Sequence, residues 1–591
     1  MEPVIGFDSE MERQHTSKIL WQDWTDDAFQ RAKTERKLVL LDISAVWCHW
    51  CHRLDQDTYS VSDIAEYIQN NFIPIRVDTD KRPDINRRYN LGGWPTTAFL
   101  TPDGRVIGGG TYFPPEQMRQ VLRDIKSAWE KSQSKISSEL GVPEPEKTPV
   151  GELSGSIVDE IVGEVANNFD PIYGGFGSQP KFPSTEAHEL ALMKYHYTGN
   201  HEFLRIVTVT LNNVGKSGVY DREMGGFFRY STVRDWSIPH FEKMCEDNAK
   251  WLQLYAHAYA ATEAEFYAEI VKGIIGYVNT WLSDQELGCF FGSQDADEEY
   301  YKLTKDERLK LKPPYVDKHI YTNWNALMIS SYLDASLVLG DVTMREFALK
   351  SLDRLLELNY KKDEGMFHFY DGQPHLPNQL ADQSTTANTL SHAYECTGDE
   401  KYVKIAEEIV QLAGNKLYDS EHGGFFDTVA DPDAPGFLSR PTKPLDENST
   451  AARALMKLHH LTGKESYRKQ AEDTLKRFME IYPSFGFMSA EYGLAVDVFL
   501  NEPTLIQIVG STDRPETRGL LTEANRVYEP RKIIKILNPN KDAAAISSSG
   551  YRVTDQPTAY ICVGRTCTAP ITEPRQIAPE VQRMVTTQVK T

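Results

Sequence analysis

Two cysteines three residues apart, Cys48 and Cys51, are the residues of this sequence best placed to do chemistry. A short apolar run at 38–43 precedes them, and apolar residues with helical spacing follow from 53 to 71. The pattern predicts a Cys-x-x-Cys at a strand-to-helix junction, where free N–H groups and the helix dipole favour a thiolate. The pKa of the first thiol can fall there from about 8.5 to roughly 3.5–7.5. We expect Cys48 to be the attacking thiol, and Cys51 to be the resolving and more covered one.

A proline downstream of the cysteines supports this interpretation. Pro95 follows Trp94 and comes directly before a short apolar run typical of a strand. A thioredoxin fold keeps a cis-proline at this place, beside its two sulfurs. We therefore predict a cis peptide bond at Pro95 that faces Cys48, and a redox site made of Cys48, Cys51 and Pro95.

Two other interpretations of the cysteine cluster stay open. His49 and His52 add two candidate metal ligands to the two cysteines, although four ligands within five residues would strain a tetrahedral site. Buried, inert thiols are the second alternative. We favour dithiol chemistry, and we expect neither a metal nor a cofactor.

Length and charge limit the classes of function. At 591 residues the chain is too long for one ordinary core. The formal net charge of −21 argues against a nucleic-acid partner, because phosphate binding needs a basic patch. We see no apolar signal region and no apolar run of transmembrane length, and therefore expect no membrane partner. Seven cysteines without a signal peptide fit a reducing compartment, so we predict a cytoplasmic protein; Cys562 and Cys567 could pair or bind a metal.

Changes of composition along the chain predict a multidomain protein with four segments. Residues 19–138 have the pattern of an α/β thioredoxin-like domain. A proline-rich, charged linker occupies residues 139–153. Residues 154–502 are all-α, and residues 503–591 form a small α/β C-terminal appendage.

The all-α segment repeats one unit six times. In each unit a helix runs into a turn rich in glycine and aromatic residues, and several of the following helices end at a C-cap glycine. Helices such as 323–339 are apolar nearly all round, whereas helices such as 400–417 carry one apolar stripe. Two concentric rings of six helices, an (α/α)6 toroid, satisfy both patterns. The varying length of the units disfavours the alternative of an open helical solenoid.

Polar and aromatic residues gather just before or at the start of the helices predicted to be inner. Asp and Asn are preferred N-caps, so each site alone is more often a cap than a catalyst. Several of them nevertheless lie on one rim of the predicted toroid, on the face that carries the long loops. This predicts a polar pocket there, in which carboxylates and aromatic side chains suit a sugar ring. Crowding there should raise at least one carboxyl pKa and give an acid that works near neutral pH. The residues predicted to line this pocket are His240, Glu242, Asp247, Trp324, Asp382 and Glu447.

Motifs along nearly the whole chain carry a family resemblance. The clearest are Cys-His-Trp-Cys-His at 48–52, Gly-Gly-Trp-Pro at 92–95, Pro-Lys-Phe-Pro at 180–183 and His-Phe-Glu-Lys-Met at 240–244. The chain resembles the spermatogenesis-associated, thioredoxin-domain protein family, which includes bacterial YyaL-type proteins. The resemblance implies a thioredoxin-like domain fused to a six-hairpin-glycosidase-like toroid, similar to that of the N-acylglucosamine epimerases.

The chain departs from the family pattern at the presumed pocket rim. Cys245-Glu246 stands where the family has Leu-Tyr, and Asp446-Glu447 stands where it tends to have Pro-Ser-Gly. Both departures put a shared toroid ligand in doubt. Trp47, directly before the first cysteine, also differs from the family pattern. It makes this segment more similar to ordinary thioredoxin, which supports redox competence.

Two functions follow from these patterns. In the first, the protein is a thiol–disulfide oxidoreductase with a protein thiol or disulfide as partner, and its toroid binds a polar ligand such as a small carbohydrate. In the alternative, the toroid is a carbohydrate-processing (glycosidase- or epimerase-like) or carbohydrate-binding domain, and the thioredoxin-like domain senses redox state. We favour the first function, because the Cys-x-x-Cys is explicit in the sequence whereas the toroid chemistry is inferred from its rim.

Overall fold

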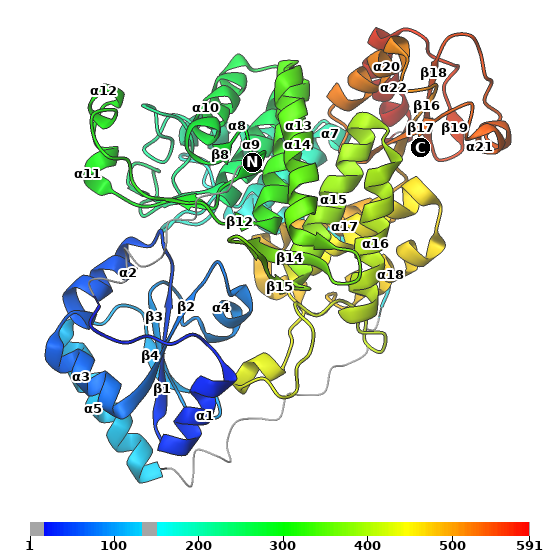
Figure 1. Cartoon of the computed structure of the whole chain (residues 1–591). Helices are drawn as coiled ribbons and strands as arrows, with labels where there is room; N and C mark the ends of the chain where they lie inside the picture. Colours follow the sequence, from blue (N-terminus) through cyan, green and yellow to red (C-terminus); the bar gives the residue numbers. More distant parts are fainter. Residues whose placement is uncertain (1–16, 133–150, 590–591) are drawn as a thin grey trace.

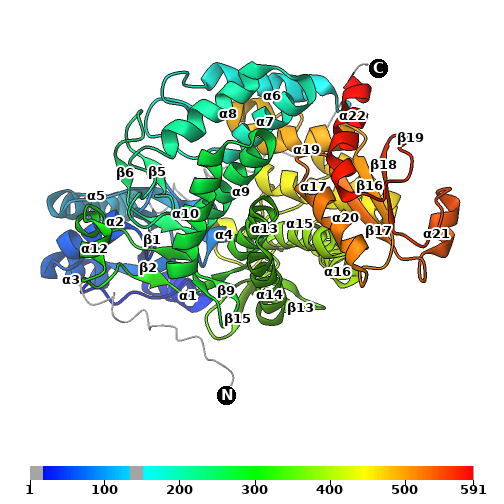
Figure 2. The same cartoon turned by 90° about the horizontal axis from the view of Figure 1, so that it is seen from above.

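The structure, a computed structural model, describes residues 17–132 and 151–589 (Figure 1). Most of the predicted linker, residues 139–150, lies outside the described residues. The chain forms an N-terminal α/β domain, a helical toroid and a small C-terminal α/β region. The N-terminal domain and the C-terminal region lie on opposite sides of the toroid in both views (Figures 1 and 2).

The N-terminal domain has a thioredoxin-like sheet in the order β2–β1–β3–β4. These strands are β2 (Phe72–Asp78), β1 (Leu38–Ser44), β3 (Thr96–Leu100) and β4 (Val106–Gly110). β2 runs parallel to β1, and β3 runs antiparallel to it. The helices are α1 (Asp26–Glu35), α2 (His49–Leu54), α3 (Ser62–Asn71), α4 (Pro83–Tyr89) and α5 (Pro115–Ser132), with a π-helical turn at Asp55–Tyr59.

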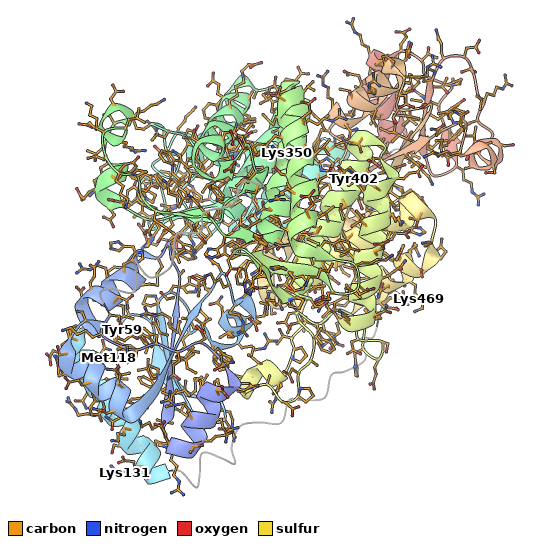
Figure 3. The ribbon with its side chains drawn as sticks, viewed as in Figure 1. Tyr59, Met118, Lys131, Lys350, Tyr402 and Lys469 are labelled. Carbon is orange, nitrogen blue, oxygen red and sulfur yellow. A yellow bond between two sulfur atoms is a disulfide. The ribbon has the colours of Figure 1, made fainter. Side chains whose placement is uncertain are left out.

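Alternate residues of β1 pack into two separate cores, one on each face of the sheet. Val39 and Leu41 belong to a cluster with residues of α1 and α4, whereas Leu40 belongs to one with residues of α3 and α5. Tyr59 and Met118, both fully buried, lie in the second cluster (Figure 3). Successive side chains of a strand point to opposite faces, so an unbroken apolar run fits a central strand that is covered on both sides.

In the described part of the toroid, six helices form a closed inner ring in which each contacts the next and the last packs on the first. These helices bury residues on more than one face. α13, for example, carries Asp334 as its one charged residue. The inner helices are α7 (Thr185–Thr198), α9 (Cys245–Thr262), α13 (Thr322–Leu339), α15 (Leu380–Thr397), α17 (Leu445–Thr462) and α19 (Ala490–Leu500).

Six outer helices each pack against an inner one and bury a single stripe. In α16, for example, the buried residues Tyr402, Ala406 and Ile409 recur every three or four positions. The predicted (α/α)6 toroid is therefore present. The outer helices are α6 (Gly155–Asn168), α8 (His201–Val214), α10 (Glu265–Trp281), α14 (Val342–Asn359), α16 (Glu400–Lys416) and α18 (Glu465–Lys476).

Short elements fill the long loops between the helix pairs. The strands are β5 (Tyr230–Ser231), β6 (Pro239–His240), β7 (Lys243–Met244), β8 (Ser283–Asp284), β9 (Cys289–Phe290), β10 (Ser293–Gln294), β11 (Val316–Asp317), β12 (Ile320–Tyr321), β13 (Tyr360–Lys361), β14 (Gly365–Tyr370) and β15 (Pro374–Pro377). The short helices are α11 (Glu298–Tyr301), α12 (Lys305–Arg308), η3 (Gly436–Ser439) and η4 (Tyr482–Ser489).

The C-terminal region is a four-stranded sheet with helices packed on it. The sheet order is β17 (Lys532–Leu537), β16 (Thr504–Val509), β18 (Thr558–Val563) and β19 (Thr566–Cys567). The helices are α20 (Pro515–Arg526), α21 (Ala543–Ser548), η5 (Pro574–Gln576) and α22 (Ile577–Val589). Cys562 and Cys567 form a disulfide between β18 and β19. Of the two possibilities for them, pairing with each other or binding a metal, the structure has the first.

The two ends of the inner ring meet different domains. Glu447, in the first turn of α17, pairs with Arg87 of the thioredoxin-like domain. At the opposite end, His196 in the last turn of α7 lies 2.7 Å from the Glu529 carboxylate of the C-terminal region. The N-terminal ends of the inner helices therefore face the thioredoxin-like domain, and their C-terminal ends face the C-terminal region.

Candidate functional site

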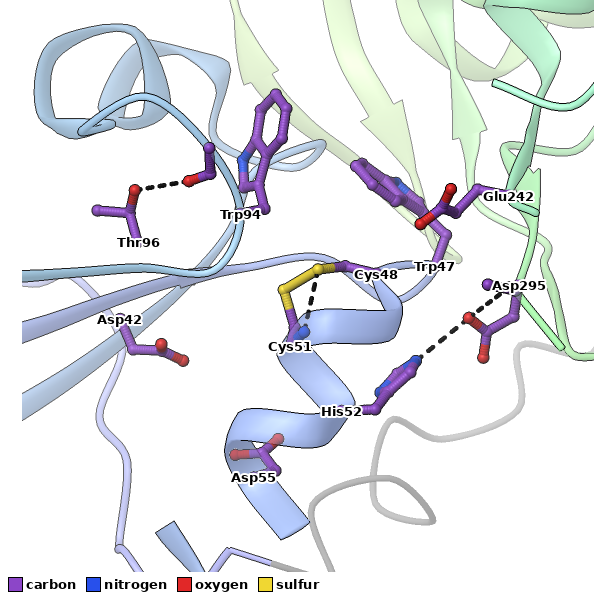
Figure 4. The surroundings of a disulfide bond; sticks show 12 residues. Asp42, Trp47, Cys48, Cys51, His52, Asp55, Trp94, Thr96, Glu242 and Asp295 are labelled. Atoms are coloured by element: carbon purple, nitrogen blue, oxygen red, sulfur yellow. Dashed lines mark hydrogen bonds and ion pairs between the residues drawn. A yellow bond between two sulfur atoms is a disulfide. The ribbon is translucent and has the colours of Figure 1, made fainter. Parts of the chain in front are cut away.

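Cys48 and Cys51 form a disulfide where β1 leads into α2 (Figure 4). Cys48 is the N-cap of α2, and its Sγ accepts a hydrogen bond from the Cys51 backbone N–H at 3.1 Å. The Trp94–Pro95 peptide bond is cis, as predicted, and Trp94 packs against the cluster that contains both cysteines. In the reduced protein, the same backbone N–H group and the start of α2 would stabilise a thiolate on Cys48.

Both cysteines are buried, with exposed fractions of 3% for Cys48 and 4% for Cys51. The two cysteines are therefore covered to nearly the same extent, and the predicted difference between them is absent here. The toroid provides the cover: Met244, directly before α9, packs into the same apolar cluster as the two cysteines, and Trp324 of α13 packs against it. A protein partner cannot touch either sulfur while the two domains are docked in this way.

A buried carboxyl group, Asp42 on β1, points toward the α2 side of the disulfide (Figure 4). Asp42 is 1% exposed, and burial raises its pKa to about 6 even though Arg76 donates a hydrogen bond to Oδ2 at 2.7 Å. Its Oδ1 accepts no hydrogen bond from the described residues. A carboxyl group with this pKa can take up or return a proton near neutral pH. Asp42 was not singled out from the sequence, although an acidic residue inside the apolar run of β1 is a signal that could have identified it.

Ion pairs hold the thioredoxin-like domain on the toroid. Arg88 of α4 donates two hydrogen bonds to the Asp427 carboxylate, at 2.8 and 3.0 Å, and both side chains are at most 4% exposed. On the other side of the disulfide, His52 Nε2 lies 3.2 Å from Asp295 Oδ1 (Figure 4). A buried, bidentate pair such as Arg88–Asp427 fixes the relative orientation of the two domains.

His368 of β14 is a third link between the domains. Its Nδ1 lies 2.9 Å from Asp382 Oδ2, and its Nε2 lies 2.7 Å from the backbone carbonyl oxygen of Asp80. Both ring nitrogens face acceptors, so the doubly protonated imidazolium satisfies both contacts. Burial opposes this charge, but the Asp382 carboxylate outweighs it and raises the pKa of His368.

A cavity of about 910 Å³ occupies the inside of the ring. All three parts of the chain form its wall: Trp47, Trp94 and Arg87 belong to the thioredoxin-like domain, and residues 525–530 belong to the C-terminal region. Exposed apolar residues of the wall, with Met488 at 68%, mark the part that opens to solvent. A space of this size and shape can hold a small molecule.

Three of the six predicted pocket residues, Asp247, Trp324 and Glu447, line this cavity. Asp247 has no hydrogen bond or ion pair within the described ranges apart from those of its helix backbone. Burial, followed by the neighbouring charge of Glu246, raises the pKa of Asp247 to about 7. The Asp247 carboxyl can therefore exchange a proton with a bound molecule near neutral pH.

The other three predicted residues, His240, Glu242 and Asp382, do not line the cavity, which corrects the predicted pocket. His240 Nδ1 lies 2.9 Å from both Glu242 carboxylate oxygens, and its ring stacks on Tyr230. Glu242 is 1% exposed, and Asp382 is fully buried by its contact with His368. These side chains hold the loops and the domain interface together.

Arg229 lies in the cavity wall and was not singled out from the sequence. Its guanidinium carbon lies 4.4 Å from the ring centroid of Trp47 and 4.9 Å from that of Trp94. Little in the sequence pointed to Arg229, because it is a single basic residue in the loop after a glycine-aromatic turn. Several wall residues outside the predicted pocket set form ion pairs along the wall: Glu186 with Lys250, Lys250 with Glu246, Glu189 with His257, and Arg453 with Glu491.

Comparison with known proteins agrees with the thioredoxin-like part of this architecture. A family model described as "Thioredox_DsbH: Protein of unknown function, DUF255" matches residues 5–142. Human spermatogenesis-associated protein 20 is 25% identical over 94% of this chain and 89% of the human chain. The chain is thus similar to spermatogenesis-associated protein 20 over nearly its whole length.

Two solved structures are similar to part of the chain. D-mannose isomerase covers 61% of the chain and 100% of its own, with a TM-score of 0.46 and 13% identity. Cellobiose 2-epimerase from Spirochaeta thermophila covers 65% of the chain and 100% of its own, with a TM-score of 0.46 and 14% identity. The toroid is defined by the ring of helix contacts described above.

Two kinds of feature are absent from the described residues. Within residues 17–132 and 151–589, no group of three or more His, Cys, Asp or Glu side chains is arranged to hold a metal ion. No helix within those ranges is long and apolar enough to cross a membrane.

Proposed function

We propose that the protein is a thiol–disulfide oxidoreductase whose redox pair is Cys48 and Cys51. The observation that carries the proposal is the pairing of the two cysteines at the N-terminus of α2, with the cis peptide bond of Pro95 in the adjacent loop. A Cys-x-x-Cys on a helix N-terminus is the arrangement that lowers a thiol pKa and gives an attacking thiolate at neutral pH.

The reaction consists of two exchange steps. The Cys48 thiolate attacks one sulfur of a substrate disulfide, and the other substrate sulfur leaves as a thiolate. Cys51, after giving up its proton, then attacks Cys48 Sγ, so that the Cys48–Cys51 disulfide forms and the first substrate sulfur leaves. Two electrons pass from the dithiol to the substrate. Asp42, a buried carboxyl group on β1, is the group we propose for taking the Cys51 proton.

A protein partner, as expected from the sequence, imposes a condition on this mechanism. Met244 and Trp324 of the toroid cover the pair, and the Arg88–Asp427 contact holds them there. Exchange with a protein therefore requires the thioredoxin-like domain to separate from the toroid first.

The rate of thiol alkylation against pH in the reduced full-length chain tests the proposal. We expect Cys48 to react with iodoacetamide faster than Cys51, with an apparent pKa below the usual value of about 8.5. A Cys51→Ser variant keeps the Cys48 reaction and serves as the control. If neither cysteine reacts below about pH 8, Cys48 has no stabilised thiolate and the proposal fails.

A second function is favoured by one observation in the cavity. Asp247, whose side chain has no hydrogen-bond partner in the described residues, shares the wall with Trp324, so a carboxyl group and an aromatic ring face the same space. We propose that the cavity binds a polar, hydroxyl-rich molecule such as a small carbohydrate. Titration calorimetry of the full chain with neutral mono- and disaccharides tests this; binding should weaken in Asp247→Asn, and no heat with any sugar would refute it.

A further inference from the structure

Met244, like Trp47, belongs both to the cavity wall and to the cluster around the disulfide. It lines the cavity, and it packs with Cys48, Cys51 and Trp47 in one apolar cluster in which it is itself 5% exposed. Met244 therefore stands between the space inside the toroid and the redox pair. Methionine has three rotatable side-chain bonds and repacks at low cost, so it can move aside without displacing the backbone.

The rest of this part of the wall is more rigid. Trp47 is 3% exposed, and its indole N–H donates a hydrogen bond to Asp80 Oδ2 at 2.6 Å. Arg229 lies against Trp47 and Trp94 together. Large, hydrogen-bonded or stacked side chains move less readily than an unbranched thioether. The easiest opening from the cavity to the disulfide is therefore at Met244.

The cavity itself fits a small polar molecule and excludes a folded protein. Its volume is about 910 Å³, and charged side chains such as Glu186, Lys250 and Arg453 face into it. A small thiol with a polar body would find hydrogen-bond donors and acceptors there. A protein partner would instead need the docked domains to come apart.

We infer that a low-molecular-weight thiol, or the disulfide formed from it, is the exchange partner of Cys48–Cys51. This molecule reaches the pair through the cavity, past Met244. The inference rests on the proposed function. In the reductive direction, a thiolate RS⁻ attacks Cys48 Sγ, the Cys48–Cys51 bond breaks, and Cys51 leaves as a thiolate that takes up a proton. A second RS⁻ then attacks the sulfur that carries R in the mixed disulfide, and Cys48 leaves as a thiolate that takes up a proton. The products are RSSR and the Cys48–Cys51 dithiol, with two electrons transferred.

The test compares three reductants on the oxidised full-length chain: glutathione, glutathione linked to a polyethylene glycol too large for the cavity, and reduced thioredoxin. Acid quenching, alkylation and mass spectrometry of the Cys48–Cys51 peptide give each rate constant. We expect the two large reductants to be at least about tenfold slower than glutathione. In Met244→Ala the glutathione rate should rise about tenfold, while the rates of the large reductants stay the same.

Two variants control for effects of substitution alone. Met244→Leu keeps the volume of the side chain and should react nearly as the wild type does. Met456→Ala removes a buried methionine of α17 that belongs neither to the wall nor to the cluster, and should leave all rates unchanged.

Each remaining outcome overturns the inference in a recognisable way. Equal rates with free and polymer-linked glutathione, or a Met244→Ala effect that is the same for all three reductants, would show that the pair is reached by separation of the domains. The proposed oxidoreductase function would survive that result. It would fail together with the inference only if no thiol reduced the pair in any variant, including Arg88→Met, in which the docking contact is broken.

Discussion

Arg229 of the toroid lies over the indole ring of Trp47, with 4.4 Å between its guanidinium carbon and the ring centroid. Trp47 directly precedes Cys48, and Arg229 also lies 4.9 Å from the ring of Trp94, which directly precedes Pro95. One side chain of the toroid thus contacts both the segment that leads to the two cysteines and the segment that contains the cis-proline. The thioredoxin-like domain and the toroid form one packed unit around the disulfide.

Breaking the Arg88–Asp427 contact should loosen this unit. Arg88→Met leaves the Asp427 carboxylate buried with a weaker partner, Arg87, at 3.7 Å. Removal of one partner from a buried pair costs about 3–5 kcal/mol, so we expect a loss near the lower end in urea unfolding. Arg205→Met, which removes an exposed pair with Glu202, is the control and should change the stability by less than about 0.5 kcal/mol. Equal effects of the two substitutions would mean that Arg88 does not hold the domains together.

The pH dependence of stability should report His368. Because the folded pKa of His368 is raised above its ordinary value, its stabilising contribution is complete below about pH 6.5 and is lost as the pH rises through the folded pKa. The groups facing the ring are Asp382, the Asp80 carbonyl, Asp84 and Tyr321. The difference in unfolding free energy between wild type and His368→Gln should shrink from about pH 6 to about pH 9. A difference that stays constant or grows over this range would contradict the contact.

Asp42 should also lower the stability as the pH rises, but over a more acidic range than His368. Its folded pKa of about 6 lies above the ordinary value of 3.8, so its contribution lowers the stability as the pH rises between these two values. Asp42→Asn should remove this fall in stability. The measurement is the difference in urea-unfolding free energy between wild type and Asp42→Asn as a function of pH. The variant should also slow the reduction of a disulfide substrate by the Cys48–Cys51 dithiol, because the proton acceptor for Cys51 is gone. A variant with the wild-type exchange rate at every pH would remove Asp42 from the mechanism.

The Cys562–Cys567 disulfide should contribute a modest stability to the C-terminal region. It closes a short loop, for which the chain-entropy model gives about 2 kcal/mol. We expect the double variant Cys562→Ser, Cys567→Ser to lower the unfolding free energy by that amount, and the exchange rate of Cys48–Cys51 to stay the same. A changed exchange rate would link the two disulfides, which lie in different domains.

Local patterns predicted the positions of the two cysteines and of the cis-proline well. The strand, the Cys-x-x-Cys and the proline each have a fixed place in a thioredoxin-like fold, so Cys48, Cys51 and the cis bond at Pro95 could be placed from their spacing. The two helix classes likewise predicted two rings, because burial all round and burial on one stripe need different neighbours. These features depend on residues close together in the chain.

Contacts between distant segments could not be predicted in the same way. The cover over the disulfide depends on Met244, some 200 residues from Cys48, and nothing in the apolar pattern marks that pairing. Asp247 and Asp382 both lie in the first turns of inner helices, yet the first faces the cavity and the second turns to His368. The direction of such a side chain is decided by its neighbours in space, which one sequence does not identify.

The central claim is that Cys48–Cys51 is a working redox pair in the folded chain, and an equilibrium titration in glutathione redox buffers tests it most directly. Alkylation of the two cysteines after acid quenching gives the reduced fraction at each potential. The account predicts a reversible two-electron transition with a midpoint between about −180 and −280 mV, the range of catalytic thiol pairs and of the glutathione pool. A pair that stays oxidised below about −300 mV would be a structural disulfide and would contradict the account.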